Sequence, residues 1–170
     1  SSELENTLSI VNDSKKISFN QRNKIFSLIK QLTKNKILFY KLGIANVDEI
    51  DQLNILEATK LSMKRSLDKF KIESGNLIID GNFKLNYKKF NEQSIIKGDQ
   101  ISLSIATSSI IAKFFRDRLM KILSKKYSEF CWEKNVGYGT KKHIEVIMRL
   151  GPTKYHRRSF KPIKTLIHNK

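Results

Sequence analysis

The sequence contains few of the residues that mark secreted, fibrous or disordered chains. Its 170 residues include one cysteine, two prolines and seven glycines, and no apolar run approaches the length of a membrane span. We therefore expect no membrane segment. Cys131 alone cannot form an internal disulfide, so we expect a cytoplasmic protein in a reducing compartment. Hydrophobic residues make up 39% of the chain, which predicts one folded domain with a sizeable core.

Acidic residues are also scarce. The chain has 16 Asp and Glu against 33 Lys and Arg, which gives a formal net charge of +17. Such a balance favours a polyanionic partner, although a chain this rich in Lys, Ile and Asn is also what an AT-biased genome encodes. Because the positive charge is spread along the whole chain, it predicts a basic face on a folded domain in preference to a basic tail.

Two of the few carboxylates follow short apolar runs. Asp80 ends the run Leu77–Asp80 and precedes a glycine, and Asp99 follows Gly98 after a second apolar run. β-Branched runs bounded by Gly and Asn are typical of buried strands, so each aspartate is expected where a strand ends. Carboxylates on rigid supports suit a hard divalent cation. The alternative is that Asp80-Gly81 and Gly98-Asp99 are ordinary turns, in which Asp and Gly are both common.

The order of the other elements predicts an α/β fold with helices on the faces of a sheet. Ser18–Gln21 has the form of a capping box that opens a helix, and Thr140 opens another that Gly151-Pro152 stops. The remaining expected elements are a strand over 36–44, a helix over 54–70, strands ending at Asp80 and Lys97, and a long helix over about 101–127.

Other polar residues are not assigned to a site. Asp48 and Glu49 suit the first turn of a helix, where the helix dipole favours negative charge. Asp117 is expected about five turns into the long helix, away from the strand ends, in a structural ion pair. His143 and His156 have no second ligand at a metal-binding spacing, so no zinc site is predicted.

Taken in order, these pieces resemble bacterial ribonuclease HII, the type 2 ribonuclease H, from about Asn12 to Pro162. The resemblance rests on an ordered set of segments and not on any one of them. They are Asn12–Lys16, Glu49–Leu56, Leu77–Asn82, Gly98–Asp117, Val136–Thr140, Gly151-Pro152 and Tyr155–Phe160.

The resemblance implies a ribonuclease H-like mixed sheet flanked by helices, with residues 128–170 as a helical, substrate-binding extension. The family opens with a strand ending in Asp-Glu and a Gly-Arg-Gly turn, and nothing before Asn12 matches it. We therefore expect residues 1–170 to be a single, N-terminally incomplete domain without the first two strands. This chain alone is then expected to show no nuclease activity. The alternative is a non-catalytic nucleic-acid-binding relic of the fold.

The resemblance also implies a function and a set of site residues. The family cuts the RNA strand of RNA/DNA hybrids and cuts on the 5′ side of ribonucleotides embedded in duplex DNA, using Mg²⁺ or Mn²⁺. Asp80 and Asp99 match catalytic metal ligands, and Tyr138 matches the residue that reads the RNA–DNA junction. The remaining expected substrate contacts are Ser14, Lys15, Lys16, Gly137, Arg157 and Arg158. We expect the protein to act as a monomer.

Overall fold

A computed structural model describes residues 17–168 of the protein. The predicted substrate contacts Ser14, Lys15 and Lys16 therefore lie outside the described residues. Helices dominate the described part, and a small parallel sheet accompanies them, which confirms the predicted α/β class. No helix within this range is long and apolar enough to cross a lipid bilayer.

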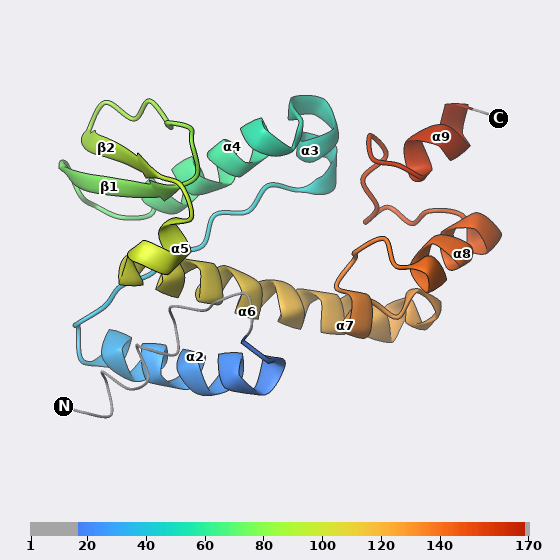
Figure 1. The fold of residues 1–170 in the computed structure, drawn as a ribbon, viewed down its shortest axis with the longest axis horizontal. Helices are drawn as coiled ribbons and strands as arrows, with labels where there is room; N and C mark the ends of the chain where they lie inside the picture. Colours follow the sequence, from blue (N-terminus) through green and yellow to red (C-terminus); the bar gives the residue numbers. More distant parts are fainter. Residues whose placement is uncertain (1–16, 169–170) are drawn as a thin grey trace. The chain divides into compact units, whose positions relative to one another are not determined.

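The chain divides into two compact units, each with its own hydrophobic core (Figure 1). The first unit comprises Ser1–Leu42 and Ser66–Phe115. The second comprises Gly43–Arg65 and Arg116–Lys170. The division of the chain into one domain with an extension over residues 128–170 stays a prediction.

Helix α2 (Phe19–Lys34) lies beside the first half of α6 (Leu103–Lys126) in the first unit (Figure 1). The predicted capping box is confirmed, because the side chain of Ser18 accepts from the N–H of Gln21 while the Gln21 side chain accepts from the N–H of Ser18. The buried residues of this core are Ile17, Ile25, Phe26, Ile29, Ala106, Ile110, Ile111 and Phe114.

The sheet of the first unit consists of β1 (Gly75–Asp80) and β2 (Phe90–Ile95). The two strands are parallel, and their register pairs Asp80 with Ile95. Parallel strands end at the same edge of a sheet, so the chain that leaves β2 emerges beside Asp80. A short helix, α5 (Gly98–Ile101), follows β2 and leads into α6.

The strand predicted over residues 36–44 does not form. Exposed and partly buried side chains do alternate over residues 37–42. A strand also needs backbone pairing, and no strand in the described part of the chain pairs with this segment. Side chains bind its carbonyl groups instead: the ammonium group of Lys69 donates to the carbonyl of Leu42 at 2.6 Å. The residues that pack inward are Leu38, Tyr40 and Leu42.

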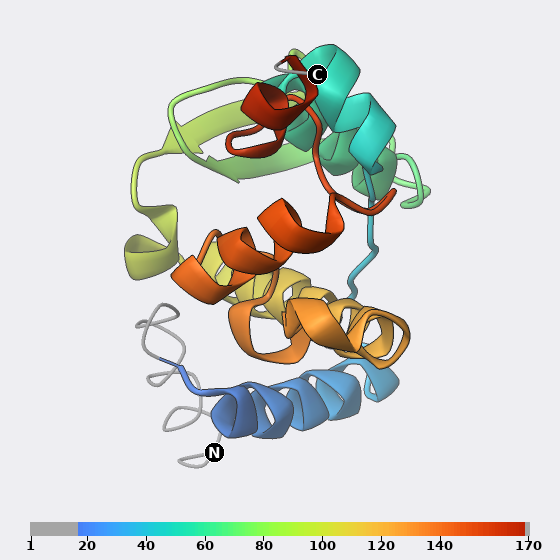
Figure 2. The same cartoon turned by 90° about the vertical axis from the view of Figure 1, so that its right-hand side faces the viewer.

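The second unit is helical. Its core gathers around Trp132, which is 2% exposed, and Figure 2 shows α8 lying over the second half of α6. The helix predicted from Thr140 to Gly151-Pro152 is confirmed as α8, with the Thr140 side chain as its N-cap. The elements are α3 (Val47–Leu53), α4 (Ile55–Leu67, whose last two residues belong to the first unit), η1 (Ser128–Phe130), α7 (Trp132–Asn135), α8 (Lys141–Leu150) and α9 (Ile163–His168).

Candidate functional site

Asp80 lies at the carboxyl end of the parallel sheet in the first unit, and Asp99 lies in the short helix that follows the neighbouring strand. Asp80 is the last residue of β1 and is exposed, and its Oδ1 accepts the backbone N–H of Gly98 at 2.9 Å. Asp99 is the next residue along from that donor and is 5% exposed. Asp80 is thus at the end of a strand, as predicted, whereas Asp99 lies beyond the end of β2, in the first turn of α5.

The turn between β2 and α5 explains this arrangement. Lys97 adopts the left-handed conformation, with φ of 55°, so the chain reverses immediately after the strand. At Gly98 an added Cβ would lie 2.5 Å from Cδ1 of Ile105, a distance that real Cβ atoms do not adopt. A side chain at this position would displace the tip of Ile105, so glycine lets α5 begin close against α6.

The donor set fits a hard divalent cation such as Mg²⁺ or Mn²⁺, which takes oxygen ligands on rigid supports. Asp80 and Asp99 would hold it, since one is solvent-accessible and the other is fixed in the first turn of α5. Within residues 17–168, no cluster of three or more His, Cys, Asp or Glu side chains gathers at any point. The described part of the chain therefore contributes a pair of carboxylates.

Glu49 belongs to a different environment. It lies in the first turn of α3, where its carboxylate makes a bidentate ion pair with Arg65 at 2.6 and 2.8 Å. The hydrogen bond from Arg65, followed by the backbone N–H of Asn46, lowers the pKa of Glu49 to about 2. The expectation that Asp48 and Glu49 open a helix is confirmed, and the Glu49 oxygens are occupied by protein donors.

Tyr138 projects from a loop whose backbone is held on both sides. Its ring is 74% exposed, while its N–H donates to the carbonyl of Asn135 at 2.8 Å. Its carbonyl oxygen lies 2.8 Å from Nδ1 of His143. Gly137 adopts a φ of +80°, and a Cβ there would lie 3.1 Å from the guanidinium of Arg116. The result is a fixed backbone that presents a free aromatic face.

Asp51 fixes the loop that carries the two predicted arginines. Its carboxylate accepts the backbone N–H groups of Arg158, at 2.8 Å, and of Ser159, at 3.0 Å. Burial raises the pKa of Asp51, but the hydroxyl and N–H of Ser159 and the N–H of Arg158 outweigh it and lower the pKa overall. Arg158 is exposed, whereas Arg157 is half-buried with its guanidinium 3.8 Å from the ring centre of Phe160.

Arg157 and Arg116 line one cavity of about 130 Å³ beside the Tyr138 loop. Burial, and then the positive charge of Arg116, lower the pKa of Arg157. Two guanidinium groups at one cavity repel each other unless an anion lies between them. The cavity and the exposed tyrosine therefore make a candidate contact surface for a phosphate backbone.

Comparison with known proteins decides the family. The profile of the family described as Ribonuclease HII matches residues 3–163. The chain belongs to that family. Among its relatives is the Ribonuclease HII of Wolbachia pipientis from Culex pipiens, 44% identical over 156 residues, which cover 92% of this chain and 76% of the relative. Another is the Ribonuclease HII of Macrococcus caseolyticus, 43% identical over 92% of this chain and 57% of the relative.

The Ribonuclease HII of Pelagibacter ubique is also similar, at 41% identity over 93% of this chain and 82% of that protein. The chain thus spans between about half and four fifths of the length of these relatives. Family membership confirms the resemblance read from the sequence and the ribonuclease H-like α/β fold, and it places the chain among the type 2 ribonucleases H.

The sequence pattern did not single out the polar residues that organise this family member's loops. Asp51 lies 107 residues from Arg158 along the chain, so no local pattern links them. Glu92 accepts the backbone N–H groups of Leu85, Asn86 and Tyr87, and so folds the β1–β2 connection around itself. The available signal was the scarcity of acidic residues, 16 Asp and Glu against 33 Lys and Arg.

Proposed function

We propose that the protein is a metal-dependent endonuclease that hydrolyses the RNA strand of RNA/DNA hybrids and cuts beside ribonucleotides embedded in duplex DNA. Family membership supports ribonuclease H activity on hybrids. The observation that supports the proposal for this chain is the hydrogen bond from Gly98 to Asp80, which ties the end of β1 to the residue that precedes Asp99. A divalent cation bound there would supply the activation of water and the stabilisation of the leaving oxygen.

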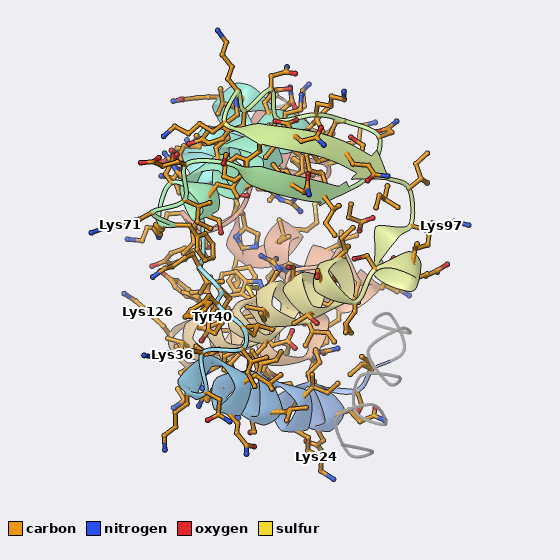
Figure 3. The ribbon with its side chains drawn as sticks, turned by 90° about the vertical axis from the view of Figure 1, so that its left-hand side faces the viewer. Lys24, Lys36, Tyr40, Lys71, Lys97 and Lys126 are labelled. Carbon is orange, nitrogen blue, oxygen red and sulfur yellow. The ribbon has the colours of Figure 1, made fainter. Side chains whose placement is uncertain are left out.

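The chain's own residues bind and orient the substrate. Exposed cations attract the phosphate backbone, and Figure 3 shows Lys24, Lys36 and Lys97 of the first unit extending away from the ribbon. Such contacts fix position without reading sequence. In the second unit the exposed side chain of Tyr138 would pack on a sugar at the RNA–DNA junction, where the 2′-hydroxyl distinguishes RNA from DNA.

The test uses an RNA/DNA hybrid, a DNA duplex with one ribonucleotide and an all-DNA duplex of the same sequence. Cleavage of the first two in Mg²⁺ or Mn²⁺, with none of the third, supports the proposal. Where the 170-residue chain alone does not cleave, the family's N-terminal Asp-Glu strand is fused in front of it. Equal cleavage of all three duplexes, or no cleavage by the fused protein, would contradict the proposal.

A second candidate function is nucleic-acid binding without catalysis. The observation that favours it is the excess of basic residues, 33 Lys and Arg against 16 Asp and Glu, which attracts a polyanion whether or not a metal binds. Two results together would establish this function. The logarithm of the binding constant for the hybrid should fall against the logarithm of the salt concentration with a slope of about −4 to −5, and the fused protein should not cleave.

A further inference from the structure

Three buried side chains in the second unit form a hydrogen-bonded cluster to which the proposed function assigns no role. The indole N–H of Trp132 donates to Nε2 of His143 at 3.1 Å. Nε2 of His156 lies 3.2 Å from the same nitrogen. The exposed fractions of the three residues are 2%, 3% and 7%, so water does not mediate between them. The positions of the imidazole protons then determine whether these contacts attract or repel.

The surroundings of His156 fix its proton. The backbone N–H of Thr153 donates to Nδ1 of His156 at 3.0 Å. Because a backbone N–H can only donate, this Nδ1 accepts and carries no proton. A neutral imidazole keeps one N–H, which places the proton of His156 on Nε2, facing His143.

The surroundings of His143 fix the complementary arrangement. Its Nδ1 lies 2.8 Å from the carbonyl oxygen of Tyr138, which can only accept, so Nδ1 carries the proton. Its Nε2 is then a bare acceptor for the N–H groups of Trp132 and His156. This assignment gives each of these contacts a donor and an acceptor, with the single lone pair of His143 Nε2 shared between the N–H groups of Trp132 and His156.

We propose that this chain of hydrogen bonds is a positioning device for Tyr138, in which neutral His143 holds the Tyr138 carbonyl and so aims the exposed ring at the ribonucleotide junction. The inference rests on the recognition role proposed for Tyr138. Glycines flank the tyrosine on both sides, and its carbonyl also accepts the backbone N–H of Thr140 at 2.8 Å, so His143 supplies a second donor that ties this carbonyl to the buried cluster. Thr140 caps the backbone N–H of His143 at 3.3 Å and fixes the imidazole at the start of α8.

Protonation of either imidazole would set an N–H against another N–H. The groups packed around His156 are the rings of Phe130 and Trp132, the Thr153 turn and His143. Burial, and then the charge of His143, lower the pKa of His156 from 6.5 to about 4. His156 is therefore uncharged at neutral pH, as its contact with the N–H of Thr153 requires.

A matched pair of substitutions separates the donor role of Nδ1 in His143 from the acceptor role of Nε2. Asparagine places an amide N–H near the position of Nδ1, so His143→Asn keeps the donor to Tyr138 and loses the acceptor. Glutamine reaches the position of Nε2, so His143→Gln keeps an acceptor and loses the donor to Tyr138. Both leave part of a buried network unsatisfied and lower the melting temperature, so melting temperature alone does not decide between roles.

The deciding measurement is the affinity of the 170-residue chain for a DNA duplex with one ribonucleotide, divided by its affinity for the all-DNA duplex, in metal-free buffer. We expect His143→Gln to lower this ratio at least about threefold, which corresponds to the net loss of one hydrogen bond, and His143→Asn to leave it unchanged. Equal ratios for both variants would overturn the inference.

Two further readouts isolate the inference from the function on which it rests. If Tyr138→Ala leaves the ratio unchanged, the recognition role itself fails; if it lowers the ratio and His143→Gln does not, the positioning role alone fails. Nitrogen NMR of the unaltered chain needs no variant. It should show a proton on Nδ1 of His143 and on Nε2 of His156, and the opposite tautomers would also overturn the inference.

Discussion

The two compact units hold their functional side chains in opposite ways. In the first, Asp80 is exposed and its carboxylate accepts the N–H of Gly98, which leaves oxygen lone pairs for a cation. In the second, the backbone of Tyr138 is bound through Asn135 and His143 while its ring is 74% exposed. A metal ligand needs vacant lone pairs, whereas a recognition residue needs a fixed backbone and a free face. Substitutions in each unit should separate these requirements.

The largest effect is expected at the carboxylate pair. Asp80→Asn keeps the oxygen that accepts the Gly98 N–H but removes the charge that compensates Mg²⁺, so cleavage of an RNA/DNA hybrid by the fused protein should fall at least about 100-fold. Melting temperature without metal should stay the same or rise, because neighbouring carboxylates repel each other. Glu73→Gln removes an exposed charge from the same unit and serves as the control. A similar loss in both variants would show that overall charge, and not the site, is responsible.

In the second unit, which carries Tyr138, a substitution should change the preference between substrates and not the overall rate of cleavage. Tyr138→Ala should reduce cleavage at a single embedded ribonucleotide about tenfold more than cleavage within a long hybrid, since loss of a stacking ring costs on the order of 1–3 kcal/mol. Tyr138→Phe keeps the ring and should retain the preference. Equal losses on both substrates would instead assign Tyr138 to packing.

Acid should destabilise the second unit, because unfolding lets the buried His156 take up a proton. Its pKa is about 4 when folded against an ordinary 6.5, so the unfolded chain takes up a proton first as pH falls. The free energy of unfolding should therefore drop by about 1–2 kcal/mol between pH 6.5 and 4, after allowance for solvent screening. His156→Gln keeps a donor toward His143 without titrating, and urea unfolding across this range should show a flatter dependence. An unchanged dependence would mean that other groups cause the loss.

The smallest effect is expected at the exposed arginine. Arg158→Ala should weaken binding of hybrid and DNA duplexes alike by a few fold and reduce the salt slope by about one, because a phosphate contact carries no sequence information. Lys24→Ala removes an equal charge from α2 in the first unit. Filter binding at several salt concentrations measures the affinity and the salt slope of both variants. A change in the preference of Arg158→Ala between hybrid and DNA duplexes would contradict a pure phosphate contact.

Local patterns were enough to predict features that depend on neighbouring residues. The capping box at Ser18, the strand ending at Asp80 and the stop at Gly151-Pro152 each follow from residues a few positions apart. The segment over 36–44 shows the limit, because alternation predicts which side chains face inward but not whether another strand is available to pair.

The contacts that organise the candidate site join distant parts of the chain. Neither the Asp51 contact with the Arg158 backbone nor the pairing of His143 with His156 has a local signature. The histidines were set aside because they lack metal-ligand spacing, and a hydrogen-bonding role for buried imidazoles has no sequence motif of its own. Family resemblance predicts Asp80, Asp99 and Tyr138 as site residues, because a motif records residues and not the contacts that support them.

Binding of Mn²⁺ to the 170-residue chain, followed by the paramagnetic resonance signal of the free ion, tests most directly the division of roles between the two units. Asp80 and Asp99 should account for the binding, so Asp80→Asn should weaken it at least about tenfold, while Glu73→Gln and Tyr138→Ala leave it unchanged. Mn²⁺ binding by Asp80→Asn equal to that of the unaltered chain, or its loss in Tyr138→Ala, would contradict the account.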